Sequence, residues 1–392
     1  MRPPLAICIP TYARAGTLGR LLSQLAEDAP DVPVLVSDNA SPDGTGELLR
    51  RAARPRLRVH HQPENVGAIG NIRWLLAHAP EAEHVWMICD DDLPAPGCVR
   101  LVRDLVVAER PAWLHLPHRW VDPAGAVVNE SPCPPDAQRF DGTGALYRAY
   151  GHWLTFGSAA VLCRDALAHA AATVETANAY APLVWFVHAA GDGPSLVAPF
   201  HAVLAGTEIT WADRVSEIVG GDYPALYEEA LSRHVDRQAF ASSLDQLYGS
   251  AWGAGILRAR SREQLAHVLQ RFPSSRVLRR TAVERAALDA DRDALGQIGE
   301  LVGDDDRGEG AALRLLGETA FAEGDSDAAQ DALESSALAD PLDPETWSDL
   351  GVVRHARGHH HAALEALGIA LGIEPEHEDA RANLLAIAGN AG

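Results

Sequence analysis

The N-terminal part of the chain alternates short apolar runs with helix-like segments. The apolar runs cover residues 5–9, 32–36, 57–60 and 85–89, and segments with helical periodicity follow the first three. Strands that alternate with helices of about 10 to 15 residues form β-α-β units, whose strands lie parallel with right-handed crossovers. The last run is apolar throughout, which is typical of a strand buried on both faces of a sheet. The sequence therefore predicts a mainly parallel, Rossmann-like α/β sheet.

A cluster of polar residues follows each of these runs. The carboxyl ends of parallel strands meet at one edge of a sheet, where open α/β folds bind ligands, so the clusters are expected to surround one ligand. Asp38 is suited to accept hydrogen bonds from a base or ribose, and the backbone after Pro10 can approach phosphates at a helix N-terminus. Taken alone, Asp38-Asn39 is more often turn chemistry. The clusters are residues 11–16, 38–46, 62–67 and 90–94.

Three consecutive aspartates, Asp90 to Asp92, end the fourth apolar run. Three like charges at the end of a buried strand repel one another, and a divalent cation that bridges to substrate phosphates would relieve this repulsion. The alternative is an acidic turn before a helix. The same tripeptide recurs at residues 304–306 without a buried strand before it, and there we expect a solvated linker. The strand context favours a metal and phosphate site at Asp90 to Asp92.

Composition excludes several classes of function. The formal net charge is −21, which disfavours nucleic acid and anionic membrane surfaces as partners. All 33 basic residues are arginine, so phosphate-loop, Schiff-base and kinase mechanisms that need a lysine are excluded. Five cysteines without a C-x-x-C spacing are typical of free thiols in a reducing compartment. No signal peptide or apolar run long enough for a membrane span is evident, so we expect a soluble cytoplasmic protein.

The chain divides into three predicted regions. Residues 1–212 form the α/β domain, residues 213–307 a helical connection that includes a degenerate repeat, and residues 308–392 a repeat region. The repeat has a period of 34 residues, and residues such as Trp347, Gly351 and Pro375 match the tetratricopeptide (TPR) pattern. Stacked helix pairs of this kind expose a concave surface that most often binds protein. Between residues 113 and 206, long loops rich in aromatic residues are expected to receive the acceptor, although Trp153 and Phe156 fit a core equally well.

The polar clusters resemble those of family 2 glycosyltransferases with the GT-A fold. The resemblance covers about residues 5–205 and rests on Ile9-Pro10-Thr11-Tyr12-x-Arg14, Val36-Ser37-Asp38-Asn39, Asn65-Val66-Gly67 with Asn71, and Asp90-Asp91-Asp92. It implies an inverting transfer from a nucleotide-sugar, with a UDP-sugar as the first choice of donor. It also implies that Asp92 and Asp90 form the D-x-D element with Mg²⁺ or Mn²⁺, Asp90 lying near the ribose or sugar. The nucleotide-sugar-binding residues that it implies are Pro10, Thr11, Tyr12, Arg14, Asp38, Asn39, Asn65, Gly67, Asn71, Asp90 and Asp91.

The sequence departs from the family at the general base. Many members carry a Glu-Asp pair about 90 residues after the D-x-D element, and this chain has no acid pair in the comparable residues 176–181. Glu175 and Asp141 are the candidates for the base. His201 resembles a histidine that some GT-A enzymes use as a further metal ligand, whereas a lone histidine on an apolar strand is more often a core residue.

Two other classes of protein compete with this interpretation. A sugar nucleotidyltransferase would carry a glycine-rich loop with basic residues after the first strand, and Pro10-Thr11-Tyr12 is not such a loop. A non-catalytic scaffold with a GT-A domain and TPR repeats is the second alternative. For an enzyme, the repeats favour a peptide or protein acceptor, with a saccharide or lipid-linked acceptor as the alternative, and they also allow a homo-oligomer.

Overall fold

The computed structural model describes residues 2–206 and 217–389. The chain forms two compact units, Met1–Phe240 and Ala241–Gly392. The predicted boundary at residue 212 lies outside the described residues. The first unit extends further because the segment after it packs on the α/β domain: the hydroxyls of Tyr147 and Tyr223 lie 2.7 Å apart, and the Phe240 ring stacks on both of these tyrosines.

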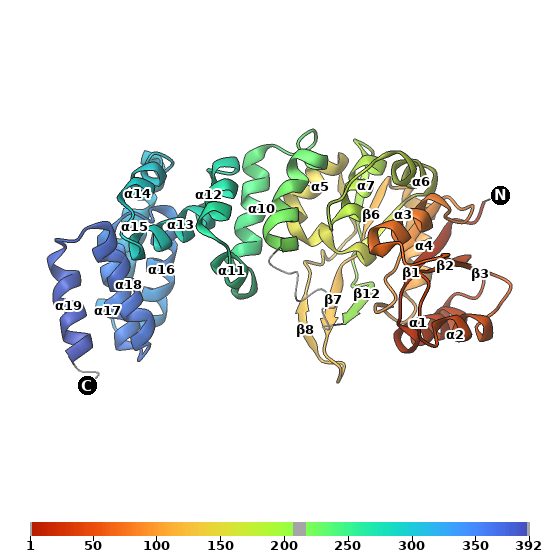
Figure 1. Ribbon diagram of the computed structural model, residues 1–392, viewed down its shortest axis with the longest axis horizontal. Coiled ribbons are helices and arrows are strands. Elements are labelled where there is room, and N and C mark those ends of the chain that lie inside the picture. Colours follow the sequence, from red (N-terminus) through yellow and green to blue (C-terminus); the bar gives the residue numbers. More distant parts are fainter. Residues whose placement is uncertain (1, 207–216, 390–392) are drawn as a thin grey trace. The chain divides into compact units, whose positions relative to one another are not determined.

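The first unit contains an eight-stranded sheet with the strand order β3-β2-β1-β4-β10-β6-β11-β9. Figure 1 labels β1, β2, β3 and β6 of this sheet. The first four strands in space are β3 (Leu57–His61), β2 (Val34–Asp38), β1 (Leu5–Thr11) and β4 (His84–Met87), and all are parallel. The other four are β10 (Ala160–Cys163), β6 (Trp113–His115), β11 (Ser195–Val197) and β9 (Gln138–Phe140). β10 is antiparallel to both β4 and β6, so β4 and β6 point the same way. The predicted mainly parallel α/β sheet is confirmed.

A second sheet of four short strands extends from the carboxyl edge of the first. Its order is β5 (Leu93–Pro94), β12 (Val203–Gly206), β7 (His118–Val121) and β8 (Val127–Glu130). β7 follows β6 after only two residues, and β5 follows the aspartates of β4. The two sheets therefore meet where the predicted site lies.

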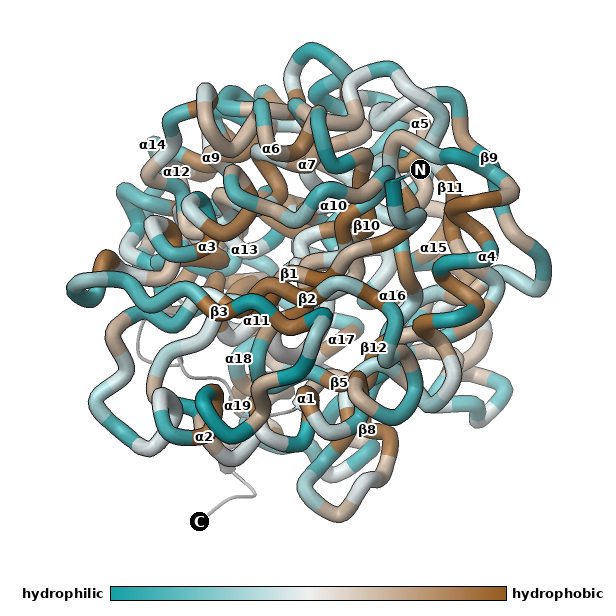
Figure 2. The backbone as a smooth tube through the Cα atoms, turned by 90° about the vertical axis from the view of Figure 1, so that its right-hand side faces the viewer, coloured by the Kyte–Doolittle hydropathy of each residue, from teal (hydrophilic) through white to brown (hydrophobic). Residues whose placement is uncertain are grey.

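Helices cover both faces of the large sheet. α1 (Ala15–Asp28) buries Leu18, Leu21, Leu22 and Leu25, a helical stripe that packs in one core with residues of α4 (Cys98–Glu109) and β1. On the other face α3 (Gly67–Ala77) contacts β1 and β2, and α6 (Arg164–Thr173) lies between α3 and α7 (Ala181–Ala190). β1 and β2 are correspondingly among the hydrophobic, brown segments between these helices in Figure 2. The remaining short elements are α2 (Thr45–Arg51), α5 (Gly142–Tyr150), η1 (Gly151–Thr155), η2 (Gly157–Ala159), η4 (Ile218–Asp222), α9 (Tyr223–Leu226) and η5 (Tyr227–Leu231).

The second unit is all helical over its described residues. Its helices are α10 (Arg237–Gly249, which begins in the first unit), α11 (Ala251–Arg258), α12 (Arg262–Arg271), α13 (Arg276–Leu288), α14 (Arg292–Gly299), α15 (Asp304–Ala322), α16 (Ser326–Ala339), α17 (Pro344–Ala356), α18 (His360–Ile373) and α19 (Glu378–Gly389). α16 and α18 begin one 34-residue period apart. A Cβ at Gly317 would lie 2.6 Å from Leu333 Cγ, and a Cβ at Gly351 would lie 2.6 Å from Leu367 Cγ. The helix pairs therefore pack alike at the predicted spacing, and their assignment as TPR repeats stays a prediction.

The prediction of a linker at residues 304–306 is wrong. These three aspartates form the first turn of α15, where carboxylates interact favourably with the helix dipole. Asp306 also lies 2.9 Å from the guanidinium groups of both Arg276 and Arg279. None of the described helices has the length and apolar character that a bilayer crossing requires.

Candidate active site

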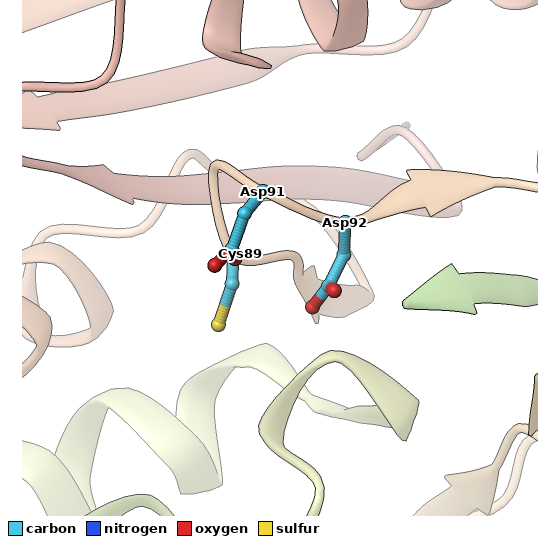
Figure 3. Close-up of side chains that lie close together, drawn as sticks. All are labelled: Cys89, Asp91 and Asp92. Carbon is cyan, nitrogen blue, oxygen red and sulfur yellow. The ribbon is translucent and has the colours of Figure 1, made fainter. Parts of the chain in front are cut away.

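The aspartates lie in a turn between the two sheets. Ile88 N donates to Cys8 O at 2.9 Å and so extends the pairing of β4 with β1 by one residue. Asp90 and Asp91 then form a turn, and β5 follows at once, paired with β12 through Pro94 and Val203. Figure 3 shows Cys89, Asp91 and Asp92 on this turn. Strands on both sides of the turn therefore fix the carboxylates at the carboxyl edge of the sheet.

Residues after β1 hold two of the aspartates. Thr11 Oγ1 donates to Asp90 Oδ2 at 2.6 Å, and Tyr12 N lies 3.4 Å from the same oxygen. Arg14 Nη1 donates to Asp91 Oδ2 at 2.6 Å. The structure thus brings together the residues after β1 and the aspartates after β4, as the sequence predicted.

The third aspartate is held by a residue that the sequence did not indicate. Ser158 Oγ, in η2, donates to Asp92 Oδ2 at 2.6 Å and accepts from Cys89 N at 2.8 Å. Ser158 carries no recognisable motif, because it becomes a neighbour of Asp92 only when β10 pairs with β4. Burial raises the pKa of Asp92 to about 8 and that of Asp90 to about 6, with the charge of Asp91 adding to both shifts.

The carboxylates fit a divalent cation. One ligand atom each of Cys89, Asp91 and Asp92 lies within 4.8 Å of the others, and this is the one such group of potential metal ligands among the residues of 2–206 and 217–389. Burial raises the pKa of the Cys89 thiol well above its usual range, so its sulfur stays protonated and is a poor ligand for a hard ion. The oxygens of Asp91 and Asp92 suit Mg²⁺ or Mn²⁺. Asp90, predicted as a metal ligand, is not in this group and is hydrogen-bonded to Thr11 instead.

Asp38 lies at the same sheet edge, at the end of β2. The residue is 3% exposed, Oδ1 accepts from Ser41 N at 3.1 Å, and Oδ2 lies 2.9 Å from His61 Nδ1. His61 ends β3 and is exposed, and no sequence pattern indicates that it reaches Asp38. The carboxylate is therefore fixed from two sides next to an accessible imidazole.

Two predicted asparagines and one glycine hold the loops of this edge together. Asn39 Nδ2 donates to Asn65 Oδ1 at 2.8 Å, and Asn39 Oδ1 accepts from Val66 N at 2.9 Å. Gly67 N donates to Asn65 Oδ1 at 2.9 Å with φ at +76°, a conformation that favours glycine. Asn71 is buried and makes hydrogen bonds to both the hydroxyl and the carbonyl of Ser37. Asn71 therefore fixes Ser37, the residue before Asp38.

The structure does not bring the predicted base candidates and His201 to the group of Cys89, Asp91 and Asp92. Glu175 is exposed, and a two-pronged pair with Arg73 lowers its pKa. Asp141 follows β9, which is four strands from β4 and runs antiparallel to β11, so Asp141 lies at the opposite edge of the sheet. His201 Nε2 lies 3.2 Å from Ser131 O and 3.7 Å from Glu130 Oε2. Their assigned roles stay predictions.

Known proteins resemble this chain in sequence and in fold. Residues 6–167 match the family model described as Glycosyl transferase family 2. The chain is 31% identical over 145 residues to the undecaprenyl-phosphate mannosyltransferase of Micrococcus luteus, an alignment that covers 36% of this chain and 56% of that protein. The chain therefore spans little more than half the length of this relative.

Among solved structures, the fold is similar to that of S. aureus TarS. The TarS 1-349 structure in complex with UDP-GlcNAc aligns with a TM-score of 0.55 at 15% identity, covering 73% of this chain and 86% of that one. The longer TarS structure aligns with a TM-score of 0.54 at 16% identity, covering 74% of this chain and 54% of that one. These likenesses concern the fold, and with the family match they confirm the predicted GT-A type of domain.

Proposed function

We propose that this chain, whose residues 6–167 form a family 2 glycosyl transferase domain, transfers a sugar from a nucleotide-sugar to an acceptor. The observation that carries the proposal is the set of buried aspartates at the end of β4, on the same sheet edge as Asp38. β2 and β4 flank β1, so Asp38 and Asp90 are about 10 Å apart by strand spacing. A nucleoside diphosphate can bridge that distance, with its base at Asp38 and its phosphates at the aspartates.

The donor is proposed to be a UDP-sugar. TarS, which shares the fold, was solved with UDP-GlcNAc. Asp38 would accept from the base or ribose, and the residues from Pro10 to Arg14 would face the ribose and phosphates. Asn39, Asn65 and Gly67 would hold the loops after β2 and β3 in position through the hydrogen bonds that join them.

Asp92 and Asp91 would hold a Mg²⁺ or Mn²⁺, with Asp90 directed to the ribose or sugar by Thr11. Bound there, the cation would offset the charge that grows on the departing diphosphate. Arg14, now paired with Asp91 at 2.6 Å, would turn to the phosphates when Asp91 takes the cation. The reaction is proposed to be a single displacement, which inverts the configuration at the anomeric carbon. The acceptor would lose its proton to a base, for which Glu175 is better placed than Asp141. α6 begins at Arg164, whose N donates to Glu83 O at the amino end of β4, and it runs back toward the carboxyl edge, where Glu175 follows it.

Two acceptor classes have support. A peptide or protein recruited by the helical repeats is favoured by the 34-residue spacing of α16 and α18. A saccharide or lipid-linked acceptor is favoured by the relative from M. luteus, which is named as a mannosyltransferase for undecaprenyl phosphate. The non-catalytic scaffold predicts neither turnover nor dependence on a metal.

A panel of nucleotide-sugars tests the proposal. The purified protein with Mn²⁺ should release nucleoside diphosphate slowly from one or a few donors, by hydrolysis where no acceptor is present. Removal of the metal with a chelator should stop the release, and Mn²⁺ or Mg²⁺ should restore it. Release from no donor in a panel that covers UDP-, GDP- and dTDP-sugars would favour the scaffold.

A further inference from the structure

A group of aromatic rings lies beside the aspartates and takes no part in the donor site. We define the aromatic wall as His118 and Trp120 of β7 with His152, Trp153 and Phe156 of the η1 segment. Ring centroids lie 4.4 Å apart for His118 and Phe156, 4.6 Å for His118 and Trp120, and 5.8 Å for Trp120 and Trp153. The wall therefore joins two segments that are distant in the sequence.

The sheet places this wall next to the proposed reaction centre. β4 and β6 are separated only by β10, so their carboxyl ends lie about 10 Å apart on one edge. Residues 156–159 bridge these ends: Ser158 Oγ donates to Asp92, and Leu116 N donates to Ala159 O at 2.8 Å. The wall is thus on the side of the aspartates opposite to Asp38, where an acceptor must approach.

The rings are not all packed as a core. His118 is fully buried, whereas Trp120, Trp153, Phe156 and His152 are each partly exposed. The pairing of β7 with β8 is irregular between Trp120 and Val121, a β-bulge of the kind that often redirects side chains near active sites. Two indole rings tilted by 47° therefore border solvent beside the site.

The wall also contains polar atoms without partners. His118 Nε2 and His152 Nδ1 are buried, and neither makes a hydrogen bond to any of the described residues. Burial lowers the pKa of His118 to about 3 and that of His152 to about 4, so both rings are neutral near pH 7. Because neither nitrogen is exposed, a ligand would contact the partly exposed rings of Trp120 and Trp153 rather than these atoms.

The charges nearby favour a neutral ligand. Arg119 alternates with Trp120 along β7 and so points to the other face, where its Nε lies 3.0 Å from Glu130 Oε2. The wall itself has no charged side chain. The partly exposed, apolar rings of the two tryptophans suit a pyranose, which has an apolar face of C–H groups.

We propose that the aromatic wall is the acceptor subsite and binds a pyranose unit of a saccharide acceptor against Trp120 and Trp153. This inference rests on the proposed glycosyl transfer. It selects a saccharide over a polypeptide as the group that lies next to the reaction centre.

Binding to the full-length protein tests the subsite without requiring turnover. The protein is labelled with 5-fluorotryptophan, and the ¹⁹F resonances of Trp120, Trp153 and Trp74 are assigned by Trp→Phe variants. Trp74 is the control because it is a partly exposed tryptophan stacked on His60 and His78, outside the wall. With UDP and Mn²⁺ present, neutral trisaccharides such as N-acetylchitotriose, cellotriose and maltotriose are then added at millimolar concentration.

At least one trisaccharide should shift the Trp120 and Trp153 resonances and leave that of Trp74 unchanged. The proposal is overturned if none shifts either wall resonance, or if a polypeptide probe such as unmodified casein shifts them and the saccharides do not. Turnover gives a second readout. Trp153→Phe and Trp120→Ala should each raise the acceptor KM roughly tenfold, because one ring contact with the acceptor is lost, while the donor KM changes little.

Hydrolysis of the nucleotide-sugar without acceptor separates the two proposals. If the wild type shows ¹⁹F shifts but no hydrolysis or transfer, the glycosyl transfer fails and the saccharide site stands. If hydrolysis occurs and both wall variants keep the acceptor KM of the wild type, the wall proposal fails and the transferase stands. Trp74→Phe should behave as the wild type in every assay.

Discussion

Ser158 Oγ lies 2.6 Å from Asp92 Oδ2. Ser158 precedes β10 and Asp92 follows β4, the antiparallel neighbour of β10. The same hydroxyl accepts from Cys89 N, which fixes the direction of its proton toward the carboxylate. A hydrogen bond to the ionised form lowers the pKa of a carboxyl group, so Ser158 partly opposes the effect of burial on Asp92. Ser158 is therefore a positioning residue that makes Asp92 available to a cation.

Ser158→Ala should weaken Mn²⁺ binding at pH 7. Without the hydroxyl the pKa of Asp92 rises further, and a larger share of the protein carries the protonated, non-binding carboxyl. Calorimetric titration with Mn²⁺ from pH 6 to 9 should show the whole pH profile moved to higher pH. Ser335→Ala, which removes an exposed hydroxyl bonded to a helix carbonyl, is the control. Overlapping profiles for Ser158→Ala and the wild type would contradict the assigned role.

Mn²⁺ affinity of the wild type should rise with pH. The pKa of Asp92 is about 8 without metal, so a proton must leave before this carboxylate binds the ion. Affinity should increase up to about pH 8 and then level off. Calorimetry in two buffers of different ionisation enthalpy should detect proton release at pH 7. Affinity that is constant from pH 6 to 8 would be incompatible with the buried carboxyl of Asp92 as a ligand.

Stability of the metal-free protein should respond to pH in the opposite sense. The folded-state pKa of Asp92 is raised from 3.8 to about 8, so between these values the folded state holds a proton that the unfolded state has released. The contribution of Asp92 to the free energy of unfolding therefore falls as pH rises from about 4 to about 8. Asp92→Asn should flatten this part of the curve of melting temperature against pH. An identical slope in the variant would assign the dependence to other groups.

Asp38→Ala should weaken the binding of UDP. Removing the carboxylate leaves donors of the base or ribose unpaired, which costs roughly 1–3 kcal/mol. Calorimetry of UDP binding measures the change, with a melting curve to verify the fold. Asp104→Ala, on the exposed side of α4, serves as the control. An unchanged dissociation constant in Asp38→Ala would rule out its contact with the nucleotide.

Two glycines of the helical region should respond differently to alanine. A Cβ at Gly351 would lie 2.6 Å from Leu367 Cγ, so Gly351→Ala should destabilise the protein by about 1–3 kcal/mol through overpacking. A Cβ at Gly308, in α15, meets no atom within 4 Å, so Gly308→Ala should stabilise it by up to about 1 kcal/mol. Chemical denaturation measures both. Equal effects would contradict the close packing of α17 on α18.

Local patterns predicted the sheet and the meeting of the loop after Pro10 with the aspartates after β4. The apolar run that ends at Asp90 and the polar residues after Pro10 follow strands, and the parallel topology alone brings them to one edge. The contact of Thr11 with Asp90 is a direct consequence of that topology.

Contacts between distant segments could not be predicted in this way. Ser158 and His61 reach Asp92 and Asp38 only through strand pairing and loop geometry, for which a lone serine or histidine carries no signal. Three consecutive aspartates predict a solvated linker at residues 304–306. The helix is formed instead because the helix dipole favours carboxylates in its first turn, and because Arg276 and Arg279, about 30 residues earlier, pair with Asp306. Tyr223 and Phe240 likewise join the first unit through contacts with Tyr147 of α5 that no local pattern indicates.

We propose that the aspartates after β4 carry a metal-dependent glycosyl transfer, and the chain contains its own control. Release of nucleoside diphosphate from the preferred nucleotide-sugar is measured with Mn²⁺ for the wild type, Asp92→Asn and Asp304→Asn. Asp92→Asn should fold and lose more than 99% of the activity, roughly the hundredfold or greater loss typical of removing one key transition-state contact. Asp304→Asn, in the exposed first turn of α15, should match the wild type. Equal activity in all three proteins would show that the aspartates after β4 are not the reaction centre.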